Sequence, residues 1–209
     1  MNLHAPTPSD PPLPWIVRER RLQPRTQISP LHLDDARVVD FNALLHELHP
    51  DAVHVDSKRL DALADWLLRL PEDDAQHVLD LRLLRLQQLR AMLDDTDWDA
   101  DPSTRARLAK LFAYLDNDDD LIPDSTPRLG RLDDVLLAEL AWPAFADEAD
   151  DYADYCGYRE EVHPTGAPEQ RRQAWIKYRL AKFAVLRQRV AVRNSRNTKV
   201  ATETSLRVR

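Results

Sequence analysis

The stretch YLDNDDDLIPDSTPRLGRLDDVLL, residues 114–137, decides the fold of this 209-residue chain. Its special residues are Asp120, Pro123, Asp124, Pro127, Gly130, Asp133 and Asp134. Pro123 restricts the residue before it to an extended conformation and therefore ends the preceding helix. Pro127 and Gly130 shape the return of the chain. Because apolar runs flank the stretch on both sides, it predicts a helical hairpin at residues 104–142.

The same residues carry a resemblance to a known family. The pattern D-L-I-P-D-x-x-P-x-x-G-x-x-D-D resembles the core motif of the YkvA-like family, a widespread bacterial domain of unknown function. The resemblance covers residues 105–140 and names no reaction. Many YkvA-like relatives continue into more hydrophobic helices. Ser125 and Thr126 replace the hydrophobic residues of the family, which argues against a membrane-proximal role and favours a soluble variant.

Apolar residues recur at helical spacing elsewhere in the chain, and no strand-like alternation occurs. Asp34 or Asp35, Ser57 and Ser103 are the expected N-caps of three helices. The expected helices are 35–48, 58–70, 71–93, 104–115, one through 135–140, and 168–193. The sequence therefore predicts an all-α fold of about six helices around a single core.

The ends of the chain differ from its middle in composition. Residues 1–30 are rich in proline and arginine and are expected to be extended or disordered. A helical domain is expected over residues 31–195, followed by a flexible basic tail at residues 196–209. Without a signal peptide or an apolar stretch long enough for a membrane span, the chain is expected to be cytoplasmic.

Charge is strongly segregated along the chain, whose formal net charge is −7. Residues 94–161 hold 20 acidic and 6 basic residues, whereas residues 169–209 hold 2 acidic and 12 basic residues. Such a division predicts either an internal electrostatic match or a basic segment that binds an outside partner.

Four aspartates of the motif are candidate metal ligands: Asp120, Asp124, Asp133 and Asp134. Carboxylate oxygens are the ligands that Mg²⁺ and Ca²⁺ require. The interpretation we prefer from the sequence is that these side chains cap helix ends and bind exposed backbone amides. A divalent cation is the alternative, and no other cofactor is expected.

Other kinds of site find little support. Asp116-x-Asp118-x-Asp120 begins like an EF-hand loop, but Leu121 and Pro127 occupy the positions that require glycine and glutamate. The three glycines form no phosphate-binding loop, and the single cysteine excludes an internal disulfide. The spacing of His46 and His49 does not fit a zinc protease. No catalytic residue is therefore assigned.

The last predicted helix is the second informative segment. Its apolar stripe is expected to pack on the core and consists of Ile176, Leu180, Phe183, Leu186 and Val190. Its basic and aromatic side chains are candidate partner-binding residues: Arg171, Trp175, Tyr178, Lys182, Arg189 and Arg193. We expect them to meet the acidic run Asp147 to Glu161, or a second subunit. Nucleic acid and an anionic membrane surface are the alternatives.

These features favour a non-catalytic interaction or accessory protein that binds a protein partner or forms a homo-oligomer. Two alternatives stay open. One is a metal-dependent hydrolase built on the Asp cluster at residues 120–134. The other is a nucleic-acid-binding accessory factor that uses the basic C-terminal helix.

Overall fold

The computed structural model describes residues 13, 31, 33–117 and 120–206, with side chains up to residue 189 except that of residue 186. The fold is all-α, and no strand occurs in this described part. Its elements are α1 (Asp35–Leu48), α2 (Ser57–Arg69), α3 (Glu72–Asp94), α4 (Pro102–Leu115), α5 (Leu132–Ala141), the 3-10 helix η1 (Trp142–Ala144), α6 (Ala146–Val162) and α7 (Pro168–Leu206). Within the same residues, no helix is both long and apolar enough to cross a membrane.

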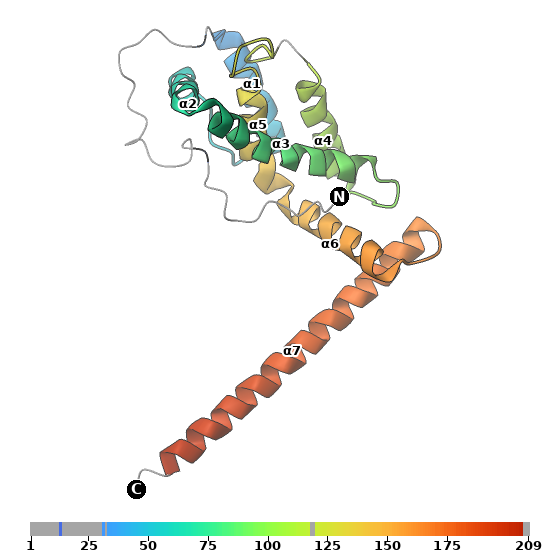
Figure 1. The fold of residues 1–209 in the computed structure, drawn as a ribbon. Coiled ribbons are helices and arrows are strands. Elements are labelled where there is room, and N and C mark those ends of the chain that lie inside the picture. Colours follow the sequence, from blue (N-terminus) through green and yellow to red (C-terminus); the bar gives the residue numbers. More distant parts are fainter. Residues whose placement is uncertain (1–12, 14–30, 32, 118–119, 207–209) are drawn as a thin grey trace. The chain divides into compact units, whose positions relative to one another are not determined.

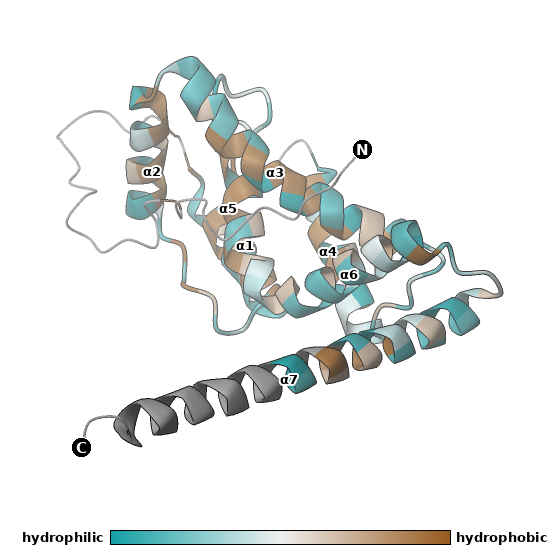
Figure 2. Ribbon diagram, turned by 60° about the horizontal axis from the view of Figure 1, so that its bottom comes forward, coloured by the Kyte–Doolittle hydropathy of each residue, from teal (hydrophilic) through white to brown (hydrophobic). Residues whose placement is uncertain are grey.

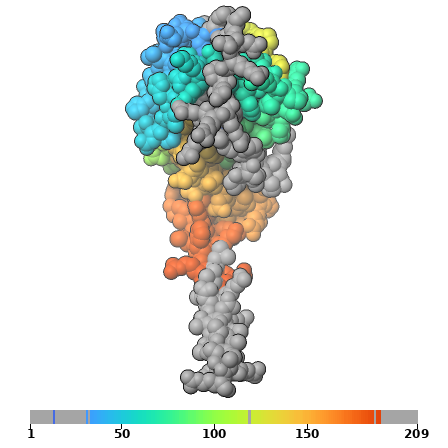
Figure 3. Space-filling view, turned by 90° about the vertical axis from the view of Figure 1, so that its left-hand side faces the viewer, coloured from blue at the N-terminus to red at the C-terminus, as the bar shows by residue number. Residues whose placement is uncertain are grey.

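The chain forms two compact units, Met1–Ala153 and Asp154–Arg209, and the boundary falls inside α6. In the first unit, α1 and α2 (blue to cyan) and α3 (green) supply much of one face (Figure 3). The sequence pattern did not indicate this boundary, because the run of helical residues through α6 is uninterrupted.

Helix α5 is the centre of the first unit. All ten of its residues are buried, and it packs against α3 and α1 (Figure 1). Its hydrophobic character stands out in Figure 2. Because the whole circumference of α5 is covered, its acidic residues Asp133, Asp134 and Glu139 are carried into the core together with its leucines.

Aspartates cap the helices α1, α2 and α4 of this unit. Asp34 caps α1, as predicted, by accepting from the amide of Ala36 at 2.9 Å. The caps of α2 and α4 are Asp56 and Asp101 rather than the serines predicted one and two residues later. A carboxylate precedes each serine and reaches amides of the first turn, and Pro102 fixes the start of α4.

Leu13 belongs to this unit although it lies far from the helices in sequence. Its side chain is buried, and its amide donates to Glu139 Oε1 at 3.2 Å. Glu139 Oε2 accepts from Arg82 at 2.7 Å and lies 3.6 Å from Arg85. The buried carboxylate of Glu139 therefore has both cationic and backbone partners, as a buried charge requires.

Candidate functional site

The turn that precedes α5 depends on a close approach of two backbone segments. The amide of Thr126 donates to the carbonyl of Pro123 at 2.8 Å, and that of Gly130 to the carbonyl of Thr126 at 2.9 Å. A Cβ on Gly130 would lie 2.2 Å from the carbonyl oxygen of Asp124. No side chain fits at that distance, so the turn requires glycine at this position.

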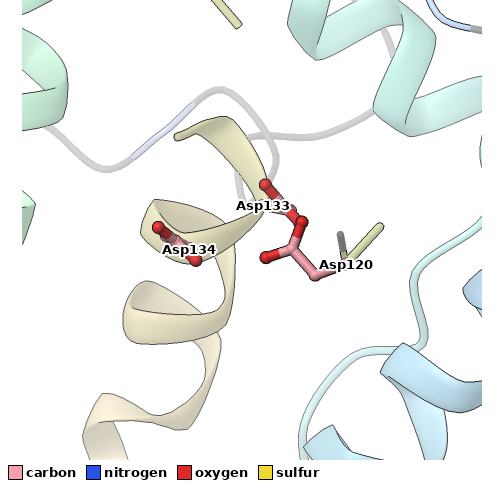
Figure 4. A group of neighbouring side chains, drawn as sticks. All are labelled: Asp120, Asp133 and Asp134. Atoms are coloured by element: carbon pink, nitrogen blue, oxygen red, sulfur yellow. The ribbon is translucent and has the colours of Figure 1, made fainter. Parts of the chain in front are cut away.

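This turn brings Asp120 against the first turn of α5, where Asp133 and Asp134 lie (Figure 4). One carboxylate oxygen of each residue lies within 4.8 Å of those of the other two. The exposed fractions are 7% for Asp120, 0% for Asp133 and 8% for Asp134. We call these three side chains the carboxylate cluster. Asp124, the fourth predicted ligand, is exposed and lies outside it.

Burial and mutual repulsion disfavour ionisation of the carboxylate cluster. Burial, followed by the negative charge of Asp133, raises the pKa of Asp120 to about 7. Burial and the charge of Asp120 raise the pKa of Asp134 to about 7. Burial also raises the pKa of Asp133 to about 6, although the hydrogen bond from Tyr114 opposes that shift. The three carboxyls therefore compete for protons near neutral pH.

Two groups outside the motif aspartates hold Asp133 in place. Its Oδ2 accepts from the hydroxyl of Tyr114 at 2.9 Å and from the amide of Ile122 at 3.1 Å. Burial and the neighbouring charge of Asp133 raise the pKa of Tyr114, so the phenol remains a donor. Neither residue was among the predicted site residues. Tyr114 lies at the end of α4, where only the fold reveals its approach to α5.

Helix capping, the interpretation preferred from the sequence, is wrong for α5. The N-cap residue is Arg131, and no side chain forms a cap hydrogen bond there. Asp133 does accept from a backbone amide, but that amide belongs to Ile122 in the turn. The reason is that Asp133 and Asp134 lie inside the first turn of the helix, two and three positions after the N-cap residue.

A surface groove of about 450 Å³ adjoins the carboxylate cluster. Its apolar lining consists of Leu83, Leu84, Leu86, Phe112 and Leu115, and its polar lining of Asp80, Gln87, Arg90, Asp116, Arg131 and Asp134. Arg90 pairs with Asp116 at 2.8 Å. Asp134 is the only residue shared by the cluster and the groove lining, so it links the buried carboxylates to the surface.

In the second unit, the aromatic residues predicted to bind a partner pack on the neighbouring helix α6 instead. Trp175 is buried, and its indole donates to Asp154 at 2.9 Å. Tyr178 donates to Glu161 at 2.9 Å. The expected contact between α7 and the acidic run is therefore made by these aromatic side chains. The indole nitrogen of Trp175 and the hydroxyl of Tyr178 donate hydrogen bonds to the carboxylates. The two rings pack against tyrosines of α6.

The basic residues of the predicted partner-binding set differ in their surroundings. Arg171 is half-buried, whereas Lys182 and Arg189 are exposed. The ammonium of Lys182 lies 5.6 Å from the ring centre of Tyr178. The side chain of Arg193 is outside the described residues.

The prediction that the apolar stripe of α7 packs on the core is wrong for its described members. Ile176, Leu180 and Phe183 are exposed by 41%, 64% and 52%. Leu186 and Val190 lie outside the described side chains. Helical periodicity shows that these residues share a face, but it does not show what covers that face. Figure 2 shows that α7 carries hydrophobic as well as hydrophilic turns.

Comparison with known proteins adds no assignment to these observations. No protein-family model, curated protein or solved structure gives a significant match to the chain. The resemblance to the YkvA-like family therefore remains a prediction that rests on the motif at residues 120–134.

Proposed function

We propose that the protein is a non-catalytic interaction protein that self-associates, with α7 of one copy docking on the acidic Met1–Ala153 unit of another. The observation that carries the proposal is the row of exposed apolar side chains Ile176, Leu180 and Phe183 on a basic helix. Exposed apolar residues in contact with one another are typical of interaction surfaces. An amphipathic helix commonly binds through residues at this i, i+4, i+7 spacing.

Charge favours a second copy as the partner. The Met1–Ala153 unit holds 31 acidic and 16 basic residues, a net charge of −15. The Asp154–Arg209 unit holds 5 acidic and 13 basic residues, a net charge of +8. Opposite potentials steer association and select partners, while the apolar side chains supply most of the affinity. Each copy offers both surfaces, so two copies can pair reciprocally.

Light scattering after size exclusion tests this proposal over a range of protein and salt concentrations. We expect a dimer at low salt that the double variant Leu180→Asp, Phe183→Asp converts to a monomer. Val185→Asp is the matched control, because Val185 is a half-exposed apolar residue of α7 that lies on another face of the helix from Leu180 and Phe183. A monomer at every concentration overturns the proposal. So does tight binding of generic DNA that weakens steeply with salt, the behaviour of a nucleic-acid-binding protein.

The groove beside Asp134 favours a second candidate function, metal-dependent hydrolysis. Asp134 joins the buried carboxylates to a groove large enough for a small ligand, and Arg131 offers a positive charge close to Asp134. A cation at the carboxylates would polarise the bond to be cleaved and activate water. Turnover of generic phosphate esters that requires both added Mg²⁺ and Asp134 is the expected result, and its absence excludes this candidate.

A further inference from the structure

We propose that Asp120, Asp133 and Asp134 together bind one divalent cation of the hard, oxygen-preferring class, Mg²⁺ or Ca²⁺. This proposal does not depend on self-association. The hydrolytic candidate, in contrast, depends on this cation site.

The spacing of the carboxylate cluster fits such an ion. Oxygens on opposite sides of Mg²⁺ lie about 4.2 Å apart, and those on opposite sides of Ca²⁺ about 4.8 Å, given their usual bond lengths. The oxygens of the cluster lie within 4.8 Å of one another. The spacing is therefore short enough for one ion to contact all three side chains, and both Ca²⁺ and Mg²⁺ are candidates. The absence of histidine and cysteine from the cluster favours these ions over zinc or copper.

Each side chain of the cluster also carries an oxygen that lacks a partner. The Oδ1 atoms of Asp120, Asp133 and Asp134 are buried and accept no hydrogen bond from any described residue. Within the described part of the chain, no basic side chain forms an ion pair with these carboxylates. Leaving buried carboxylate oxygens without partners is costly, and a cation removes that cost for all three at once.

Glu139 provides a comparison within the same helix. It lies at a similar depth to Asp134, yet it binds Arg82, is close to Arg85 and accepts the amide of Leu13. The fold therefore gives one buried acid of α5 ion pairs with two arginines, whereas the two acids at its N-terminus form no ion pair within the described residues and only the nearby charge of Arg131 acts on Asp134. A positive charge from solution is the partner that the cluster lacks.

The hydrogen bonds of Asp133 orient it for this role. Tyr114 and Ile122 both donate to Oδ2, which leaves Oδ1 of the same carboxylate available to a cation. Metal-binding carboxylates are commonly fixed by such neighbouring donors, and removing one weakens binding by about 10- to 100-fold. Tyr114 is thus a positioning residue, and the Tyr114→Phe variant should bind the cation about 10- to 100-fold more weakly.

Isothermal titration calorimetry of the full chain, freed of metal with a chelator, tests the site with Ca²⁺ and with Mg²⁺. We expect saturable binding of one ion per chain, lost in Asp133→Asn and in Asp134→Asn. Asp124→Asn is the matched control, because Asp124 lies on the same turn but is exposed and outside the cluster. Circular dichroism of each variant without metal checks that loss of binding is not loss of folding.

Terbium luminescence supplies a second readout. Tb³⁺ takes the oxygen ligands of Ca²⁺, and energy transfer from nearby Tyr114 should make the bound ion emit. Emission that Ca²⁺ displaces and Asp133→Asn abolishes supports the site. The proposal is overturned if neither ion binds at millimolar concentration. It is also overturned if the Asp133 and Asp134 variants bind as the wild type does, or if Asp124→Asn loses binding equally. Binding without any ester hydrolysis supports the cation site and excludes only the hydrolytic candidate.

Discussion

The guanidinium of Arg82 donates to Glu139 Oε2 at 2.7 Å, and both side chains are more than nine-tenths buried. Glu139→Ala should destabilise the fold by about 3–5 kcal/mol, because it leaves a buried cation without its partner. Urea denaturation measures the loss. Asp65→Ala, which breaks the exposed pair with Arg69, is the control and should cost less than about 1 kcal/mol. Equal losses in the two variants would contradict this account.

Gly130→Ala should destabilise the first unit by about 1–3 kcal/mol, because the added Cβ meets the backbone of Asp124 and the turn has to open. It should also weaken Ca²⁺ binding, since the turn positions Asp120. Gly157→Ala in α6 is the matched control. Nothing lies within 4 Å of its added Cβ, so helix propensity should make it neutral or stabilising by up to about 1 kcal/mol. Thermal melts and calorimetry compare the two, and a neutral Gly130→Ala would rule out the close approach.

Phe183→Ala should change the free energy of unfolding by no more than about 0.5 kcal/mol, because the ring is half exposed. Phe41→Ala should cost about 3–5 kcal/mol, because Phe41 is almost fully buried in the first unit. Denaturation is best followed in dilute protein at high salt, where self-association does not contribute. A large loss in Phe183→Ala would restore the prediction that this face of α7 packs on the core.

The stability of the metal-free protein should fall as the pH rises from about 4 to about 7. The pKa values of Asp120, Asp133 and Asp134, at about 7, 6 and 7, lie above the value of 3.8 for an ordinary aspartate. Below pH 4 these carboxyls are neutral in both the folded and the unfolded state, so they do not lower the free energy of unfolding. Between about pH 4 and pH 7 the unfolded state releases protons that the folded state retains, so stability is lost across this range and levels off above it.

The free energy of unfolding should fall by a few kcal/mol. One pKa unit corresponds to about 1.4 kcal/mol, and the shifts of coupled groups do not simply add. Urea denaturation in a chelator at several pH values measures this decrease. Asp133→Asn should flatten the profile, and Ca²⁺ at pH 8 should restore the stability of the wild type. If the stability of the wild type depended on pH in the same way as that of Asp133→Asn, the raised pKa values would be contradicted.

Much of the fold was predictable because local signals and the core pattern agree along residues 34–115. Asp34 caps its helix as expected, and the long α3 begins directly after Pro71. The cap of α4 was predicted two residues late, because Asp101 and Ser103 are both good caps and only the backbone decides between them. The motif predicted a turn at the correct place, since Pro123 and Gly130 impose constraints that do not depend on tertiary contacts.

The carboxylate cluster was only partly predictable. The motif suggested four aspartates, but side-chain direction after the turn separates the exposed Asp124 from the buried Asp120. Tyr114 joins the site through packing of α4 against the rest of the unit, which no spacing in the sequence reveals. The stripe on α7 was assigned to the core because periodicity identifies an apolar face and carries no information on its partner.

The hydrogen bond from Leu13 to Glu139 sets a limit on how far the chain can be shortened. The two residues are 126 positions apart, and the bond ties the beginning of the polypeptide to its central helix. A fragment that starts at Asp34 keeps every helix of the first unit but lacks the buried side chain of Leu13 and one hydrogen-bond donor to the buried carboxylate of Glu139. Such a fragment should melt at a lower temperature and be cleaved faster by trypsin than one that starts before Leu13. Leu13 thus contributes to the core of the first unit, and domain boundaries drawn from the helices alone would remove it.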